Sequence, residues 1–270
     1  MTISPVTAQG SGAGTRYSVT AQAGCGAWSG SQVTASRRPV PSGATRGTIS
    51  SGPASTGAAT ATGYFGSGKD QPLIGDWNCD GIDTPGLYRR SGGAVYLRNS
   101  NTQGIADIRF FFGNPGDLPL AGDFDGDGCD SVSMYRPSEA RIFVINELGS
   151  NNAGLGAAEF DFMFGNPGDK PFVGDFDGDG IDTVGLHRES TGLVYFRNTL
   201  TTGIAHSQFI YGDPGDVLVS GDWDGDGDDT VAVYRPSNGL LYVKLDNTQG
   251  YADAAIPAGN GYQTLAPHRR

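Results

Sequence analysis

The sequence predicts an all-β fold, a β-propeller-like array of four repeats of about 47 residues, each with three or four short strands. An acidic ten-residue string occurs four times, beginning at Gly75, Gly122, Gly174 and Gly221, with spacings of 47, 52 and 47 residues. Large apolar residues alternate with small ones after each string, which suits a strand packed closely against a neighbouring sheet. No segment shows the 3.6-residue apolar period of a helix.

Each repeat contains the same parts in the same order. A turn precedes the acidic string, and an apolar run that ends in an aromatic residue or His and an Arg follows it. The turns span 65–70, 112–117, 164–169 and 211–216. The apolar runs end at Tyr88-Arg89, Tyr135-Arg136, His187-Arg188 and Tyr234-Arg235. With a hairpin turn and a second apolar run after them, these parts predict a unit of the size of a propeller blade.

One such sheet cannot bury both of its faces, so neighbouring units must stack face to face. The sequence leaves open whether four units close a ring alone or need the N-terminal segment or a second chain. In the fourth unit the repeat pattern ends over 251–262 without another Phe-Gly turn, which favours a natural terminus of the repeat array there.

The chain divides at about residue 63, into a leader (1–63) and a repeat domain (64–270). The leader has no Asp or Glu and is rich in Ser, Thr, Ala and Gly, a composition typical of a flexible, partly disordered segment. Residues 16–21 and 31–35 alternate weakly, so an ordered extra sheet is the alternative. All 29 acidic residues lie in the repeat domain.

The acidic strings match the oxygen-ligand pattern of a calcium loop. In the third copy Asp175, Asp177 and Asp179 stand at positions 1, 3 and 5, and Gly180 at position 6 permits a sharp turn. The carbonyl of Ile181, at position 7, would be a further ligand. Carboxylates this close repel one another unless a cation lies among them. The alternative is a set of solvated acidic turns.

Two further positions recur. Position 8 is Asp83, Asp130, Asp182 and Asp229, and position 9 is Thr84, Ser131, Thr183 and Thr230. The sequence does not decide which of them completes each site. In the first copy Asn78 and Cys79 replace an Asp and a Gly, so we expect the weakest site there, whereas the fourth copy gains Asp228.

These repeats resemble the FG-GAP and VCBS family, through the Phe-Gly turns at Phe65, Phe112 and Phe164, the variant Tyr211-Gly212, and the acidic loops. The resemblance covers about 64–260 and implies a propeller that holds up to four Ca²⁺ ions in its loops. The family pattern has a carboxylate at position 9, whereas this chain has it at position 8. With position 8 included, the expected metal ligands are Asp76, Asn78, Asp80, Ile82 and Asp83; Asp123, Asp125, Asp127, Cys129 and Asp130; Asp175, Asp177, Asp179, Ile181 and Asp182; and Asp222, Asp224, Asp226, Asp228 and Asp229.

Composition excludes several functions. The net charge of -11 argues against a nucleic-acid partner, and no apolar run is long enough to insert into a membrane.

No signal peptide is visible over 1–10. Cys25, Cys79 and Cys129 allow one disulfide, but the sequence does not select the pair.

The sequence favours a non-enzymatic, secreted or cell-surface protein for adhesion to, or recognition of, a glycan or a protein, with self-association as a further option. The alternatives are a structural or assembly subunit or spacer of a surface structure or filament, and an accessory part of a secreted hydrolase. No catalytic motif is present. His187 takes a Tyr position and is expected to pack; His206 and His268 lie in polar segments. Tyr195, Arg197 and Asn198 are either ligand contacts or, as we favour, an aromatic core with Arg at the strand edge.

Overall fold

The computed structural model describes residues 65–66, 70–150, 152–224 and 226–257, together with four strand segments of the leader. Every helix-or-strand element in this part of the chain is a β-strand. Accordingly, the described residues contain no helix that could cross a membrane. Cys25, His268 and most of the leader lie outside them, as do Ser67–Lys69 of the first turn and the end of the 251–262 segment.

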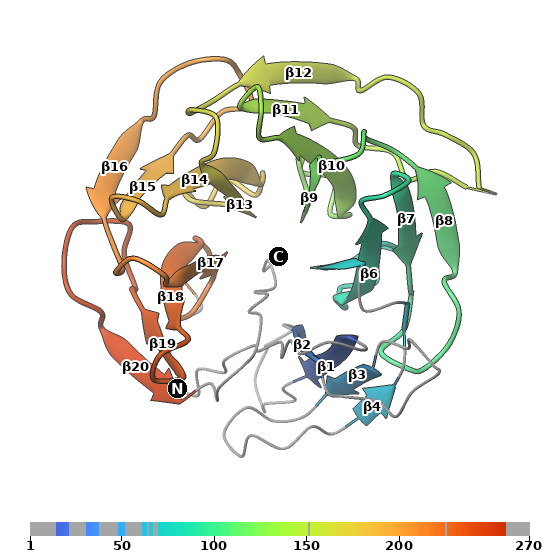
Figure 1. Ribbon diagram of the computed structural model, residues 1–270, viewed down its shortest axis with the longest axis horizontal. Helices are drawn as coiled ribbons and strands as arrows, with labels where there is room; N and C mark the ends of the chain where they lie inside the picture. Colours follow the sequence, from blue (N-terminus) through green and yellow to red (C-terminus); the bar gives the residue numbers. More distant parts are fainter. Residues whose placement is uncertain are drawn as a thin grey trace.

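The four repeats form four antiparallel, four-stranded sheets arranged as the blades of a β-propeller, which confirms the predicted fold class. The first strand of a blade lies nearest the axis and the fourth at the rim, as β9 and β12 show in Figure 1. The blades are β5 (Gln71–Gly75), β6 (Thr84–Arg89), β7 (Ala94–Leu97) and β8 (Ile108–Phe111); β9 (Leu118–Gly122), β10 (Ser131–Arg136), β11 (Arg141–Val144) and β12 (Phe160–Met163); β13 (Lys170–Gly174), β14 (Thr183–Arg188), β15 (Leu193–Phe196) and β16 (Ser207–Ile210); and β17 (Val217–Gly221), β18 (Thr230–Arg235), β19 (Leu240–Val243) and β20 (Ala254–Pro257).

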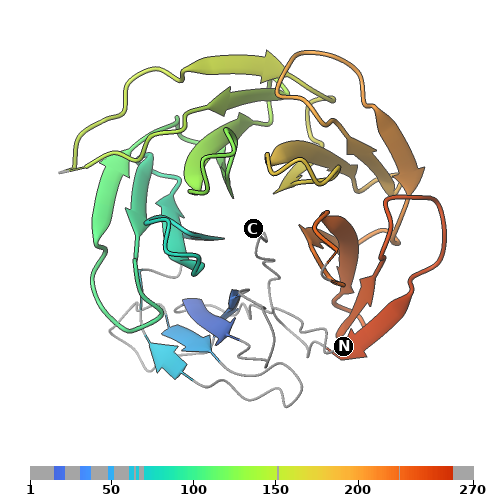
Figure 2. The ribbon, with the colours of Figure 1, turned by 180° about the vertical axis from the view of Figure 1, so that it is seen from behind.

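Hydrogen-bonded strand pairing between named strands stays within each sheet, so strand pairing does not close the ring in the described part of the chain. A further four-stranded sheet comes from the leader and lies between the fourth and first blades in both views of the ribbon (Figures 1 and 2). Its strands are β1 (Thr15–Ala21), β2 (Ser31–Arg37), β3 (Thr48–Ser51) and β4 (Ala61–Gly63). The two weakly alternating stretches of the leader lie within β1 and β2, and both strands contact β6 of the first blade.

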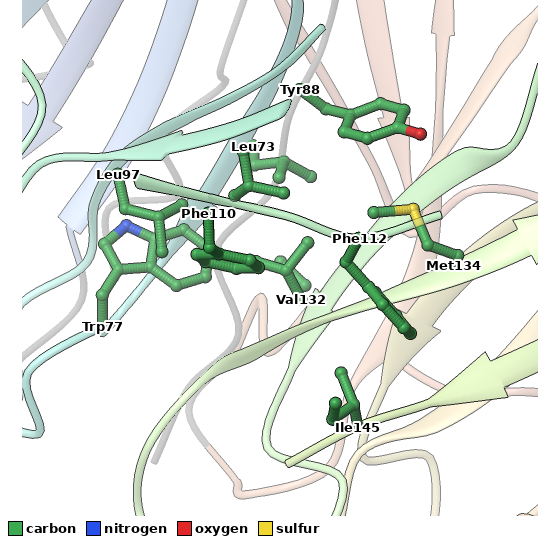
Figure 3. Packing of buried hydrophobic residues seen from close by; sticks show 11 residues of the cluster. Leu73, Trp77, Tyr88, Leu97, Phe110, Phe112, Val132, Met134 and Ile145 are labelled. Carbon is green, nitrogen blue, oxygen red and sulfur yellow. The ribbon is translucent and has the colours of Figure 1, made fainter. Parts of the chain in front are cut away.

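The hydrophobic core lies between the blades. Figure 3 shows Trp77 and Phe110 of the first blade packed with Val132 and Met134 of the second, and similar clusters join the second blade to the third and the third to the fourth. The small residues of the second strands allow this close approach. Within the third blade, a Cβ at Gly185 would overlap the ring of Phe172, its partner on the adjacent strand, and that ring packs in the cluster shared with the fourth blade.

The innermost strands are sheet edges, and their second residue is proline in three blades: Pro72, Pro119 and Pro171. Proline has no N–H to offer a further strand, so it is tolerated at an edge and limits pairing across the axis. The starts of these strands therefore surround the axis without forming a continuous sheet.

Candidate metal centres

The acidic strings connect the innermost strand to the second strand of each blade. Because the strands run in the same order in every repeat, these four loops share one face of the propeller. The Phe-Gly turns lead from the rim strand of one blade into the innermost strand of the next, so they lie on the opposite face.

The first carboxylate of each fully described loop organises the loop backbone. Oδ1 of Asp123 accepts hydrogen bonds from the N–H groups of Gly126 (2.8 Å) and Asp127 (3.1 Å), and Oδ2 accepts from that of Gly128 (2.9 Å). Asp175 is used in the same way in the third loop, with nearly the same distances. The first carboxylate of the loop therefore sets the loop shape through hydrogen bonds to the loop backbone.

Positions 2 and 6 hold the loop in place. The aromatic residue at position 2 is buried, and the indole N–H groups of Trp77 and Trp223 donate to the carbonyls of Thr84 and Thr230, both at 3.0 Å. The glycine at position 6 has a positive φ in all four loops, as the sharp turn requires. These glycines are Gly81 (80°), Gly128 (91°), Gly180 (86°) and Gly227 (108°).

Three of the loops bring three carboxylates together. In each group one oxygen per residue lies within 4.8 Å of the others. Carboxylate oxygens at this density suit a hard divalent cation such as Ca²⁺. The groups are Asp123, Asp125 and Asp127; Asp175, Asp177 and Asp179; and Asp222, Asp224 and Asp226.

The close approach of the carboxyl groups within a loop shifts their pKa values. Partial burial, together with the charges of Asp127 and Asp123, raises the pKa of Asp125. In the fourth loop, burial and a hydrogen bond with Asp226 raise the pKa of Asp228 to about 6. The same hydrogen bond lowers the pKa of Asp226. The raised pKa values of Asp125 and Asp228 show that these environments disfavour the ionised carboxylate, a cost that a bound cation would offset.

The first loop differs from the others, as the sequence predicts. Asp76 accepts from the N–H groups of Asp80 (3.1 Å) and Gly81 (2.7 Å), so the loop has the same shape. However, Asn78 replaces one carboxylate, and its amide donates to Oδ2 of Asp80 at 3.0 Å. With two carboxylates in its first five positions, this loop brings together fewer carboxylates than the three others.

The structure directs the position-8 carboxylates toward the neighbouring blade. Asp130, Asp182 and Asp229 are buried, and Oδ2 of each accepts a hydrogen bond from the N–H of the first loop residue of the preceding blade. Their own N–H groups donate to the carbonyl of that same residue. None of the three belongs to the three-carboxylate groups, so the geometry favours a role in joining blades.

The position-9 hydroxyl groups also bond to the backbone. Thr84 donates to the carbonyl of Arg98 (2.6 Å), and Thr230 donates to that of Lys244 (2.8 Å). Ser131 and Thr183 reach the carbonyls of Gly122 and Gly174, the residues that precede their own loops. The hydroxyl groups therefore tie the loop ends to the sheet.

A disulfide joins two neighbouring loops. Cys79, at position 4 of the first loop, is bonded to Cys129, at position 7 of the second, with a Cα–Cα distance of 4.8 Å. The same positions meet in the next pair of loops, where a Cβ at Gly126 would lie 3.2 Å from Cγ1 of Ile181. The pairing that the sequence left open thus follows from a contact that recurs around the ring.

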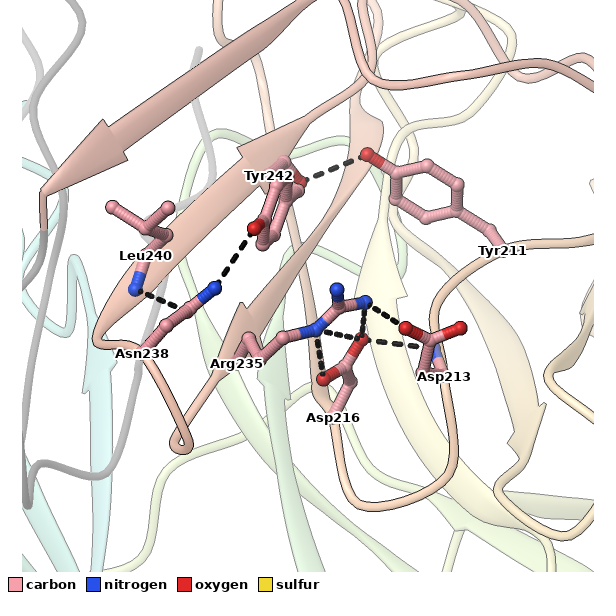
Figure 4. A network of polar contacts seen from close by, with 7 residues as sticks. All are labelled: Tyr211, Asp213, Asp216, Arg235, Asn238, Leu240 and Tyr242. Atoms are coloured by element: carbon pink, nitrogen blue, oxygen red, sulfur yellow. Dashed lines mark hydrogen bonds and ion pairs between the residues drawn. The ribbon is translucent and has the colours of Figure 1, made fainter.

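A salt bridge between an Asp and an Arg also recurs in all four repeats, and it was not predicted from the sequence. The last residue of each Phe-Gly turn is a buried Asp that forms a salt bridge with the Arg that ends the second strand. In Figure 4 the guanidinium of Arg235 donates to both oxygens of Asp216, and it also lies 4.7 Å from the ring centroid of Tyr242. The pairs are Asp70–Arg89, Asp117–Arg136, Asp169–Arg188 and Asp216–Arg235. The signal was available, because 19 residues separate the partners in every repeat.

The residues considered as ligand contacts are occupied within the protein. The hydroxyl of Tyr195 accepts from Arg188 at 2.6 Å. The guanidinium of Arg197 is largely buried and donates to the carbonyls of Thr201 and Ile204, both at 2.6 Å. The backbone N–H of Asn198 donates to Nδ1 of His206. These contacts favour the reading in which they support the strand edge.

A scan against protein-family models gives no match for this chain, and a search of curated proteins gives no significant match. The functional assignment therefore depends on the repeated motif and on the geometry of the loops.

Proposed function

We propose that the protein is a calcium-stabilised β-propeller of the FG-GAP and VCBS type, which acts outside the cytoplasm as a non-enzymatic protein for adhesion or recognition of a glycan or protein ligand. The observation that carries this proposal is the recurrence of three carboxylates within 4.8 Å at the same place in three successive blades. A cation bound among them would hold the loop face of the propeller in one conformation.

Calcium suits these loops better than magnesium does. The loops offer carboxylates from an irregular backbone, and Ca²⁺ accepts six to eight oxygens in irregular geometry, whereas Mg²⁺ demands a near-ideal octahedron. Extracellular calcium modules of this kind bind at about 10⁻⁴ to 10⁻³ M. The loops would then be filled outside the cell.

The disulfide supports the same location. Bonds such as Cys79–Cys129 form and persist in oxidising compartments and are rare in the cytosol. A covalent link between two loops also suits a protein that must keep its loop face rigid. Together these features favour secretion or display on a surface.

A thermal melt of the full chain in a metal-free buffer, in millimolar Ca²⁺ and in millimolar Mg²⁺ tests the proposal. With millimolar Ca²⁺ at about ten times the dissociation constant, each site adds about 1.4 kcal/mol to the free energy of unfolding. The triple variant Asp125→Asn, Asp177→Asn and Asp224→Asn should lose most of the shift, whereas Asp161→Asn, on a rim strand, should keep it. If Ca²⁺ produces no specific shift, the loops are solvated acidic turns and the proposal fails.

One observation favours assembly as a second candidate function. Three repeats expose a large apolar side chain at the same place in the loop before the rim strand: Ile105 (86%), Ile204 (87%) and Tyr251 (96%). Contacts between copies of the chain would bury these side chains. Sedimentation at rising concentration tests this candidate: Ile204→Ser should reduce any self-association, and a monomer at all concentrations argues against it.

A further inference from the structure

A pocket of about 450 Å³ lies on the propeller axis at the face opposite the acidic loops. It is lined by the first residues of the innermost strands β5, β9, β13 and β17, so all four repeats contribute to it. This volume is within the range of small-molecule sites, which combine apolar walls with a few polar groups. Leu118, Pro119 and Val217 provide part of the apolar wall.

The third blade departs from the repeat at this pocket. Its strand β13 opens with Lys170, where the other repeats have Gln71, Leu118 and Val217. His187 stands where the others have Tyr, and Glu189 stands where they have Arg90, Pro137 and Pro236. All three residues are titratable and line the pocket, and Lys170 lies directly opposite His187 in the β13–β14 pairing. His187 replaces a Tyr that the other three repeats share, whereas Lys170 and Glu189 stand at positions that vary from repeat to repeat, so the third blade places its own set of polar groups in this hollow.

His187 has a buried polar atom that no described residue uses as a hydrogen-bond partner. The side chain is 3% exposed, and its Nε2 is buried without a hydrogen-bond partner among the described residues. Burial lowers the pKa of His187 against the opposing charges of Glu189, Asp216 and Asp169, so the imidazole is neutral at neutral pH. The hydroxyl of Tyr135, at the same position in the second repeat, also lacks a partner but does not line the pocket. Buried polar atoms normally have partners, and a ligand in the pocket would supply one for His187.

The charges around the pocket indicate which kind of ligand it accepts. Arg90 and Lys170 are exposed cations on its wall, and Glu189 is an exposed anion. Arg90 donates one hydrogen bond to the carbonyl of Gly116 (3.1 Å). Asp70 also lines the pocket, but its carboxylate forms a salt bridge with Arg89. With Asp70 paired to Arg89, the two cations Arg90 and Lys170 outnumber the single anion Glu189 on the pocket wall, so the local charge favours an anionic group.

We propose that this axial pocket binds a small hydroxylated carboxylate, an acidic monosaccharide unit, with its carboxylate at Lys170 and Arg90 and its hydroxyl groups at Nε2 of His187 and at Glu189. The carboxylate matches the two cations, and the hydroxyl groups match a neutral imidazole and a carboxylate acceptor. This inference rests on the proposed recognition function, because it assigns that function a ligand class and a place.

Calorimetric titration of the full chain in Ca²⁺ with sodium glucuronate and with glucose tests the inference. We expect glucuronate to bind at least about tenfold more tightly than glucose, since glucose lacks the carboxylate. Lys170→Val and His187→Tyr install residues that the chain itself carries at the equivalent positions of other repeats, so both variants should fold. Each should weaken glucuronate binding about fivefold or more. Arg109→Gln removes an exposed cation from the rim strand β8 and should change nothing.

Equal affinity for the two sugars, no detectable binding of either, or glucuronate binding that neither pocket variant weakens would overturn the inference. The melt in Ca²⁺, run on the same samples, keeps the two proposals apart. A chain that shows the calcium shift but does not bind glucuronate retains the proposed calcium-stabilised function and loses only this ligand. An oligosaccharide with a terminal glucuronate, tested in parallel, distinguishes recognition of a free acid from recognition of a glycan end.

Discussion

Oδ2 of Asp182 accepts a hydrogen bond from the N–H of Asp123 at 2.9 Å, and the N–H of Asp182 donates to the carbonyl of Asp123 at 2.7 Å. The last residue of one acidic loop thus forms two hydrogen bonds with the first residue of the loop in the preceding blade. Because Asp123 also organises its own loop, the joining of blades and the geometry of the carboxylate group depend on the same residue.

We expect Asp182→Ala to lower the free energy of unfolding by about 1–3 kcal/mol, because it leaves the buried N–H of Asp123 without its acceptor. Asp182→Asn keeps an acceptor oxygen and should cost less. Urea denaturation in saturating Ca²⁺ measures both changes. The number of calcium ions bound, measured by calorimetry, should stay the same in both variants. A loss of one ion would instead identify position 8 as a metal ligand.

The Asp–Arg pairs between turn and strand should contribute more to the free energy of unfolding than exposed ion pairs do. Asp169→Asn removes a buried carboxylate that Arg188 binds through two nitrogens at 2.8 Å each, and we expect a loss of about 1–3 kcal/mol. Asp161→Asn breaks the exposed pair with Arg141, for which about 0–1 kcal/mol is usual. Chemical denaturation of the two variants side by side checks the order. Equal losses would show that burial of Asp169 adds nothing.

Thiol titration checks the disulfide. The bond between Cys79 and Cys129 leaves Cys25 as the third cysteine of the chain, so one thiol should titrate after unfolding without a reductant and three after reduction. The partners are 50 residues apart in sequence, and closure of a loop of this length stabilises the folded chain by about 4 kcal/mol on the chain-entropy estimate. The double variant Cys79→Ser and Cys129→Ser should therefore melt at a lower temperature, whereas Cys25→Ser should not. Three titratable thiols before reduction would contradict the pairing.

The features that the sequence predicted are local in the chain. The repeats, the strands and the carboxylates at positions 1, 3 and 5 all follow from residues within a few positions of one another. The position-8 contacts could not be read in this way, because Asp76 and Asp130 are 54 residues apart and meet only once the blades are in register. The disulfide depends on the same register. The Asp–Arg pairs lie between these cases, because their constant separation of 19 residues is visible in the sequence but gains meaning only when the turn and the strand end are known to meet.

We expect His187 to make the stability of the protein depend on pH. Its pKa in the folded chain is lowered from the ordinary value of 6.5, mainly by burial. Between the lowered pKa and 6.5 the unfolded chain binds more protons than the folded chain, so the free energy of unfolding falls as the pH is lowered through this range. His187→Tyr replaces the imidazole by the residue found in the other three repeats and removes this dependence. The difference in free energy of unfolding between the variant and the original chain should therefore grow in favour of the variant as the pH falls below about 6.5. Urea denaturation of both chains at several pH values between 7.5 and 5 measures this difference. Parallel pH profiles would show that the buried imidazole has the same proton affinity in the folded and unfolded chains.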